Sequence, residues 1–371
     1  MAHRASHAPQ ALVPEAPRGL VVAVDLDDPQ RPLEPELLEF EALIDAAGAR
    51  VVDRIVQRRN AVDASTLVGS GKAHEIAEHA KAIDASIVFV FNDLRTRQRK
   101  NLEKIVPLPI VDRTMLILDV FARHARSREG KVQVELAQLK YRQSNLIGLG
   151  ADLSRLGGGI GTRGPGETKL EVDRRKISQR VAILERQLEG VRRQRATRRA
   201  APHREPLVAL VGYTNVGKSS LLNALTRADA LVADQPFATL DPTVRRLYLA
   251  PGTYVRLADT VGFITDLPKD LVNAFRATLE ELRSADLLIH VLDASNPDWP
   301  RQRASVEAIL TELELDGTRR LLVFNKSDLT PGAILPGDAL AVSARSGLGL
   351  DELRAVLVDE AQADAAKNAA R

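Results

Sequence analysis

The 371-residue sequence contains no cysteine. Without thiols, the chain can form neither a disulfide framework nor a thiolate metal site, which excludes disulfide-stapled secreted folds and cysteine-ligated zinc folds. The absence of cysteine also favours a reducing compartment. A chain of this length is expected to form two or three domains, each with its own core.

Long apolar runs are also missing. No stretch approaches the roughly 18 uninterrupted apolar residues of a membrane span, and the opening MAHRASHAPQALVPEAPRG has no apolar signal core. We therefore expect a cytoplasmic protein without stable membrane insertion.

Net charge is small, at +3, but it is unevenly distributed. Residues 121–204 hold 20 Lys and Arg against 8 Asp and Glu, so the rest of the chain is acidic. A block of this kind is either the solvated face of a helix or a surface for a polyanionic partner such as RNA.

The N-terminal part alternates strand-like and helix-like segments. GLVVAVD, RVVDRIV and SIVFVF have the composition of strands, and PELLEFEALIDAAG and LRTRQRKNLEKIV that of helices. They predict a small α/β domain over 19–128, after a disordered tail at 1–18. Within it, GSGKA (69–73) resembles half a nucleotide loop but lacks the first glycine and the final hydroxyl, so a turn capping a helix is the better interpretation.

Heptad spacing of apolar residues begins at residue 129 and predicts an antiparallel helical hairpin over 129–200. Its two stripes are Val132, Leu136, Leu139 and Leu146, and then Ile177, Val181, Leu184, Leu188 and Val191. The second helix is expected to give way to a basic linker containing Arg192, Arg193, Arg195, Arg198, Arg199 and Arg204.

The tip of this hairpin would be GGGIGTRGPGETKLE (157–171), which matches the dinucleotide fingerprint GxGxxG at Gly159, Gly161 and Gly164. No strand precedes the glycines, and Pro165 and Gly166 are expected to interrupt the chain before a helix starts, so a cofactor site is disfavoured. Arg155, Arg163 and Lys169 instead suit contact with RNA phosphates, and Glu167 and Thr168 are candidate helix caps. The alternative is a flexible hairpin end without a partner.

PLVALVGYTNVGKSSLLNAL is a strand, a complete GxxxxGK[ST] loop from Gly212 to Ser219, and an apolar helix. In such a loop, backbone N–H groups surround the phosphates, Lys218 reaches the β and γ oxygens, and the Ser219 hydroxyl binds Mg²⁺. Downstream, FNKSD ends a strand, and the Asp328 carboxylate can accept hydrogen bonds from the N1–H and N2 amine of guanine. VSARSG would meet the guanine carbonyl, so the nucleotide is expected to be GTP.

Two further segments are candidate switches that respond to the γ-phosphate. RLADTVGF places Asp259 where it can hold Mg²⁺ through water and Gly262 where its N–H can meet the γ-phosphate. FATLDPT offers Thr239 and Thr243 as the hydroxyl that completes the Mg²⁺ shell, and we prefer Thr239. Asn215 matches a position that holds a monovalent cation in potassium-activated GTPases, which adds K⁺ as a candidate.

Together with the hairpin, LVGSGK and SRLGGGIGTRGPGETKLEVDRR, these motifs resemble the HflX family of ribosome-associated GTPases over about 19–364. The resemblance implies a protein that binds the large ribosomal subunit and its rRNA, with the hairpin tip near the peptidyl transferase centre, and that splits stalled or stress-inactivated ribosomes. It also supports Thr239. Some relatives carry a further C-terminal domain, whereas this sequence ends soon after LDELRAVLVDEAQAD.

The expected fold class is α/β, with an N-terminal α/β domain, a helical hairpin insertion and a Ras-like P-loop GTPase domain over 205–371. We expect a monomer that hydrolyses GTP and does not bind DNA; the alternative is a non-catalytic GTP-dependent RNA-binding or ribosome-assembly scaffold. Lys218, Thr239 and Gly262 are the candidate catalytic residues, and Ser219 and Thr239 the metal ligands. The residues expected to contact nucleotide are Gly212, Tyr213, Thr214, Asn215, Val216, Gly217, Lys218, Ser219, Phe237, Ala238, Thr239, Leu240, Asp241, Asp259, Thr260, Val261, Gly262, Asn325, Lys326, Ser327, Asp328, Ser343, Ala344 and Arg345.

Overall fold

The computed structural model describes most of the chain, and it divides into two compact units, Met1–Leu116 and Ile117–Arg371. The described residues are 15–28, 31–156, 165–199, 205–226, 236–237, 239, 243–264, 282–337 and 339–369. Within them, the side chains of 145–156, 165–170, 192, 194–199 and 364–369 are not described. Residues 157–164 of the predicted glycine-rich tip (157–171) therefore lie outside the described residues, as do Ala238, Leu240 and Asp241.

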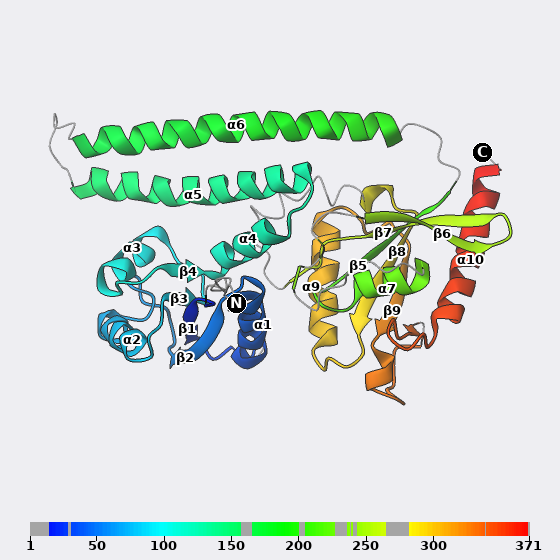
Figure 1. Cartoon of the computed structure of the whole chain (residues 1–371), viewed down its shortest axis with the longest axis horizontal. Helices are drawn as coiled ribbons and strands as arrows, with labels where there is room; N and C mark the ends of the chain where they lie inside the picture. Colours follow the sequence, from blue (N-terminus) through cyan, green and yellow to red (C-terminus); the bar gives the residue numbers. More distant parts are fainter. Residues whose placement is uncertain are drawn as a thin grey trace, which may run out of the picture. The chain divides into compact units, whose positions relative to one another are not determined.

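The first unit contains a four-stranded parallel sheet with strand order β2-β1-β3-β4 (Figure 1). Its elements are β1 (Arg18–Asp25), α1 (Leu33–Ala46), β2 (Arg50–Arg58), α2 (Ser70–Ala82), β3 (Ile87–Val90), α3 (Thr96–Ile105) and β4 (Ile110–Asp112). Right-handed crossover helices normally connect parallel strands and cover the faces of the sheet. Accordingly, the central strand β1 is buried along almost its whole length, whereas β2 at the edge alternates between exposed and half-buried residues.

The strands and helices that we predicted for this unit are present, whereas β4 and α4 (Arg113–His124) went unpredicted. β4 has only three residues, too few to show the alternation of a strand, and α4 follows it directly. Gly69 caps the N-terminus of α2 with φ 87°, as expected for a turn that starts a helix. β1 begins at Arg18, the last residue of the predicted tail.

Two long antiparallel helices form the predicted hairpin: α5 (Arg128–Leu156) and α6 (Pro165–Arg199) (Figure 1). Leu136, Leu184 and Leu188 form its buried core, and Val132, Leu139 and Val181 pack against them. Charged pairs flank this core: the Arg180 guanidinium binds both carboxylate oxygens of Glu135 at 2.7 and 2.9 Å, and the Lys140 ammonium lies 2.8 Å from Glu185. These six residues of the predicted heptad stripes thus pack together as expected. Ile177 and Val191 are not part of this cluster, and the side chain of Leu146 is not described.

The structure corrects both ends of the second hairpin helix. α6 begins at Pro165, which we expected to interrupt the chain, because proline is tolerated in the first turn, where its missing N–H has no helical partner to lose. Thr168 consequently lies inside the helix rather than at its cap. α6 also continues to Arg199. Arg, Gln and Ala are strong helix formers, and the sequence contains no glycine or proline between Arg192 and Pro202. The linker expected from Arg192 is therefore helical up to Arg199.

The six-stranded sheet of the second unit has strand order β10-β9-β8-β5-β7-β6, and only β6 is antiparallel to its neighbour. Its elements are β5 (Leu207–Gly212), α7 (Lys218–Thr226), β6 (Thr243–Ala250), β7 (Thr253–Asp259), the 3₁₀ turn η1 (Leu282–Ser284), β8 (Leu287–Asp293), α9 (Trp299–Glu312), β9 (Arg320–Asn325), η2 (Ser327–Leu329), β10 (Leu340–Ala341) and α10 (Leu350–Ala369). The central strands β5 and β8 are buried throughout. This arrangement confirms the predicted α/β fold class.

The order of the parallel strands places the functional motifs together. In doubly wound sheets, ligands bind beyond the carboxyl ends of the strands. Here β5 leads into the GxxxxGK[ST] loop, β7 ends at Asp259 and β9 ends at Asn325. Segments more than a hundred residues apart in sequence therefore meet at one edge. None of the described helices combines the length and apolar character needed to cross a membrane.

Candidate nucleotide-binding site

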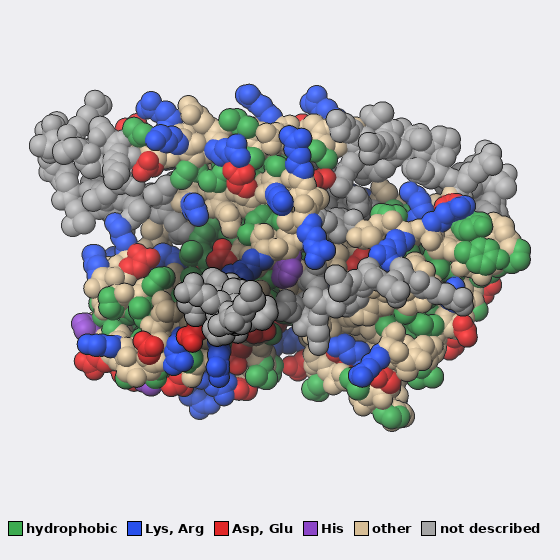
Figure 2. All heavy atoms as spheres, viewed as in Figure 1, with side chains coloured by type: hydrophobic (Ala, Val, Ile, Leu, Met, Phe, Trp, Pro, Cys, Tyr) green, Lys and Arg blue, Asp and Glu red, His purple; other side chains and the backbone are tan. Residues whose placement is uncertain are grey.

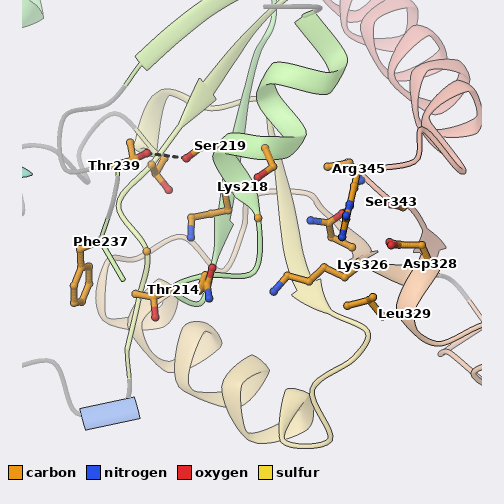
Figure 3. A pocket seen from close by; sticks show the side chains of 17 residues that line it. Thr214, Lys218, Ser219, Phe237, Thr239, Lys326, Asp328, Leu329, Ser343 and Arg345 are labelled. Atoms are coloured by element: carbon orange, nitrogen blue, oxygen red, sulfur yellow. Dashed lines mark hydrogen bonds between the residues drawn. The ribbon is translucent and has the colours of Figure 1, made fainter. Parts of the chain in front are cut away.

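A pocket opens at the carboxyl edge of the six-stranded sheet (Figure 3). The loop after β5, the end of β7, the turn after β9 and the loop after β10 all contribute to its wall. Its lining residues are Thr214, Asn215, Gly217, Lys218, Ser219, Ser220, Phe237, Thr239, Thr260, Gly262, Asn325, Lys326, Asp328, Leu329, Ser343, Ala344 and Arg345.

The loop between β5 and α7 has a backbone that only its glycines make possible. Gly217 has φ 90°, and a Cβ at this position would lie 2.3 Å from the Asn325 Nδ2. Asn215 also has a left-handed backbone, with φ 59°, a conformation that asparagine tolerates better than most residues. The loop curls around the start of α7 and leaves space for an anion there.

Lys218, the first residue of α7, directly follows this loop and is buried. Its ammonium donates to the carbonyls of Gly212 at 3.1 Å and Tyr213 at 2.7 Å. Burial lowers the pKa of Lys218 to about 8, and the nearby Asp259 carboxylate partly opposes that shift. An anion entering the pocket would favour the charged ammonium, so the site is built to bind a negatively charged group.

Three oxygen-bearing side chains converge beside Lys218. The Ser219 hydroxyl donates to Asp259 Oδ2 at 2.5 Å, and the Thr239 hydroxyl donates to the same oxygen at 3.0 Å. The two hydroxyls are 2.7 Å apart (Figure 3). Burial raises the pKa of Asp259, whereas the bonds from Ser219 and Thr239 and the charge of Lys218 lower it. The second carboxylate oxygen, Oδ1, is buried and has no hydrogen-bond partner among the described residues.

This oxygen cluster fits a small, hard divalent cation. Mg²⁺ prefers oxygen ligands and normally keeps several waters, so two hydroxyls and a carboxylate within reach of it are a suitable donor set. An unpaired buried carboxylate oxygen is costly unless a cation or water satisfies it. The structure brings Thr239 into this cluster, whereas Thr243 is the exposed first residue of β6.

The segment after β7 closes against the loop after β5. The backbone N–H of Phe263 donates to the Gly212 carbonyl at 3.1 Å, and that of Thr214 donates to the Phe263 carbonyl at 2.7 Å. A Cβ on Gly262 would lie 2.9 Å from the Thr214 Cα and 3.1 Å from the Lys218 ammonium. Only a glycine backbone can therefore lie this close to Lys218. The next residue, Phe263, is buried, at 1% exposed.

At the opposite end of the pocket, Asn325 joins three segments. Its Nδ2 donates to the carbonyl of Val216 at 2.9 Å, and its Oδ1 accepts from the backbone N–H of Ala344 at 3.0 Å. Ser327 Oγ donates to the Val342 carbonyl at 2.8 Å. Asn325 therefore fixes the positions of the phosphate loop and of VSARSG relative to Asp328, which lines the same end.

Sequence reasoning found most of the pocket. Of the described candidates, Gly212, Tyr213, Val216, Asp259, Val261 and Ser327 support the walls rather than line them. Ser220 and Leu329 line the pocket without having been predicted, and each lies one residue beyond a motif. Gly349 was also missed: it has φ 68°, and a Cβ there would lie 2.0 Å from the Ala341 carbonyl, so it allows the loop carrying Ser343–Arg345 to close.

Three sequence families match successive parts of the chain. The family described as GTP-binding GTPase N-terminal matches residues 34–122, and that described as GTP-binding GTPase Middle Region matches 124–201. The family described as 50S ribosome-binding GTPase matches 207–326.

Proteins of similar sequence agree with these matches. GTPase HflX of Caldanaerobacter subterraneus subsp. tengcongensis is 48% identical over 349 residues, covering 93% of this chain and 80% of that protein. GTPase HflX of Escherichia coli K12 is 43% identical over 346 residues, covering 91% and 81%. This chain belongs to the HflX family of GTPases.

One solved structure similar to this HflX family member is that of SsGBP in complex with GDP. It has a TM-score of 0.51 at 23% identity, and the match covers 94% of this chain and 99% of that one. At this identity the likeness shows a shared fold.

Proposed function

We propose that this pocket binds GTP with Mg²⁺ and that the chain hydrolyses it there to GDP and phosphate. The observation that carries the proposal is the Ser219–Thr239–Asp259 oxygen cluster next to the buried Lys218 ammonium. A phosphate-binding loop, a cation site and a lysine positioned side by side are the components that phosphoryl transfer requires.

In this proposal, one end of the pocket binds the phosphates and Mg²⁺, and the other end binds the guanine base. Lys218 and the N–H groups of the loop bind the β- and γ-phosphates, and the Gly262 N–H faces the γ-phosphate. Ser219 and Thr239 would hold Mg²⁺ directly, and Asp259 would hold it through water. The cation would supply positive charge to balance the charge of the phosphate oxygens. Asp328 accepts from the guanine N1–H and N2 amine, and Ser343, Ala344 and Arg345 surround the guanine carbonyl.

Phe263 predicts a slow intrinsic reaction. It occupies the position after the second-switch glycine, where a glutamine orients the attacking water in Ras-like enzymes, and a phenyl ring can neither donate nor accept such a hydrogen bond. We therefore expect slow turnover by the free protein and strong stimulation by its partner. An equal kcat with and without large ribosomal subunits would contradict this part of the proposal.

We further propose the large ribosomal subunit as that partner, with the basic hairpin contacting rRNA. The family matches support a ribosomal partner. Exposed cations support rRNA contact, and Figure 2 shows Lys and Arg side chains along the hairpin. Those on α6 whose side chains are described are Arg174, Arg175, Lys176, Arg180, Arg186 and Arg193. GTP and Mg²⁺ would order both switches and favour the bound state, and hydrolysis would release it.

One comparison tests the ribosomal part. Subunit dissociation is measured by sedimentation of whole ribosomes with the protein and GTP, a non-hydrolysable analogue, or GDP. A ribosome-splitting GTPase dissociates subunits with GTP and the analogue but not with GDP, and only GTP allows repeated rounds. Binding to the large subunit without any dissociation would instead favour a GTP-dependent assembly scaffold.

Two variants test the pocket assignment. Lys218→Ala and Asp259→Asn are each expected to raise the Kd for GTP–Mg²⁺ or to reduce turnover at least tenfold, measured by titration with a fluorescent nucleotide and by phosphate release. Asp316→Asn, an exposed carboxylate of the same unit that pairs with Arg320, is the matched control. Unchanged binding and turnover in both pocket variants would refute the assignment.

A further inference from the structure

Lys326 in FNKSD has a carboxylate partner that none of the nucleotide motifs contains. Its ammonium lies 2.7 Å from Oδ2 of Asp293, the last residue of β8. The Asp293 side chain is 13% exposed, so this pair is less screened by solvent than a surface ion pair.

The Asp293 carboxylate is itself fixed in place. Its Oδ1 accepts from the backbone N–H of Ser295 at 2.9 Å and from the Ser295 hydroxyl at 2.6 Å. Asp293 is also paired in register with Asn325 across β8 and β9, and the Ala294 N–H donates to the Asn325 carbonyl at 2.9 Å. Oδ2 therefore presents a fixed charge beside the backbone from which Lys326 projects.

The Lys326 side chain is consequently held by its ammonium, which Asp293 binds. The backbone from which it projects has the left-handed φ of 62°. Figure 3 shows the side chain pointing away from Asp328 and toward the side of the pocket where Thr214 lies. A free lysine would sample many rotamers and lose that freedom on binding a ligand.

We infer that Asp293 is a positioning residue for nucleotide binding: it holds Lys326 extended along the pocket so that the four methylenes of the lysine face the flat side of the purine ring. This inference rests on the proposed function, because it places the guanine at the Asp328 end. The guanine base then binds against lysine methylenes that are already ordered. The conformational entropy of the Lys326 side chain is therefore lost during folding and not during nucleotide binding. The contact is the same for GDP and GTP and for the ground and transition states, so it contributes to binding and not to the chemical step.

The test is a double-mutant cycle in the full-length protein, read as the Kd for GDP and as kcat and KM for GTP. Asp293→Asn keeps the shape and the acceptor for Ser295 but removes the charge that holds the ammonium. We expect it to raise the Kd for GDP and the KM about tenfold, while kcat at saturating GTP changes by less than twofold. Lys326→Met keeps an apolar stem without an ammonium and is expected to have a similar effect.

In the Lys326→Met background, Asp293→Asn should change the Kd by less than twofold, because no ammonium remains to be held. A tenfold effect of Asp293→Asn that persists in that background would mean that Asp293 only supports the fold of the loop, and it would overturn the inference. An unchanged or lower Kd in the single variant would overturn it too. Glu314→Gln, which removes the exposed Arg283–Glu314 pair of the same unit, is the control for loss of an ion pair.

Asp328→Asn separates failure of this inference from failure of the proposed function. An asparagine amide at 328 would donate to the 2-carbonyl of xanthine and lose the acceptor for the guanine amine. If Asp328→Asn leaves GDP affinity unchanged, the proposed guanine site is wrong. If it shifts preference toward xanthine nucleotides while Asp293→Asn has no effect, only the role of Asp293 is refuted.

Discussion

At the scale of single residues, the second unit contains several buried polar groups whose environments differ sharply. Lys218 and Asp259 are buried next to each other in the pocket, and the charge of each opposes the pKa shift that burial imposes on the other. His290, in the middle of β8, is 2% exposed, and its Nε2 has no hydrogen-bond partner among the described residues. We expect the Lys218–Asp259 pair to affect nucleotide binding and the buried His290 to affect the stability of the unit.

His290 makes this unit sensitive to acid. Burial lowers its pKa to about 4; the charge of Glu307 opposes this shift, and the charges of Arg303, Arg320 and Lys218 add to it. Because the unfolded chain takes up a proton near pH 6.5 and the folded protein does not until about pH 4, stability falls as pH drops through this window. The slope is about 1.4 kcal/mol per pH unit, or roughly 3 kcal/mol in total.

The measurement is denaturant unfolding between pH 4.5 and 7.5, followed by the fluorescence of Trp299, the sole tryptophan of the chain. Trp299 packs edge-on against Phe324 of β9, so it reports on this unit. His290→Gln is expected to show a shallower pH dependence over this window than the wild type. The same slope in both proteins would show that His290 does not cause the acid sensitivity.

Two explanations account for an asparagine at position 215, and one substitution distinguishes them. Its left-handed backbone explains an asparagine by conformation alone, whereas the potassium hypothesis requires its carboxamide oxygen. Asn215→Gly keeps the backbone conformation and removes the carboxamide. We expect wild-type GTP turnover to be faster in K⁺ than in Na⁺ and Asn215→Gly to lose that difference. Equal wild-type rates in the two salts would remove the potassium hypothesis.

At the scale of elements, the hairpin has its own small core, separate from the nucleotide pocket. Leu184 is 1% exposed between α5 and α6, whereas the adjacent Ile183 is 46% exposed. The three buried leucines and the ion pairs beside them hold the two helices together. The hairpin and the pocket should therefore respond to different mutations.

Leu184→Ala is expected to destabilise the hairpin by about 2–3 kcal/mol, because it removes buried methyl groups and leaves a cavity. The nucleotide Kd should not change. Hydrogen exchange of α5 and α6 amides measures local opening, and Ile183→Ala is the exposed control that should leave exchange unaffected. Faster exchange in α7 or β5 as well, or a weaker nucleotide Kd, would show that the two elements are not independent.

At the scale of the whole molecule, the excess of positive charge is concentrated in residues 121–204, and the nucleotide-binding motifs lie elsewhere in the sequence. A GTPase that acts on a ribosome needs both a polyanion-binding surface and a nucleotide-dependent switch. The two functions should be separable by mutation, since the cations expected at the hairpin tip are far in sequence from every nucleotide motif.

The double variant Arg163→Ala with Lys169→Ala is expected to weaken large-subunit binding, reduce the slope of log K against log salt by about 1–2, and abolish ribosome splitting. GTP affinity of the free protein should stay unchanged. The control variant Lys81→Ala with Lys100→Ala removes the same charge from exposed lysines of the first unit. Wild-type splitting by the tip variant would show that these two cations are dispensable.

The sequence by itself determined the motifs whose functional residues are neighbours in the chain. The GxxxxGK[ST] loop, NKSD and the heptad stripes are local patterns, because a phosphate loop, a base-binding turn and a helix face are each built from neighbouring residues. Their flanking strands also indicated the fold class. Short elements such as β4 left no periodic signal, and Pro165 was misjudged because its effect depends on its position in the helix.

Only the tertiary structure decided which distant residues meet. It brought Thr239, which the sequence already favoured over Thr243, into contact with Ser219 and Asp259. It also used Asn325 to join the phosphate loop to VSARSG and placed Asp293 against Lys326. These pairings follow from strand order and register, since parallel strands far apart in sequence end at one edge of the sheet. No local pattern encodes that order, so the contacts that complete the site could be read only from the folded chain.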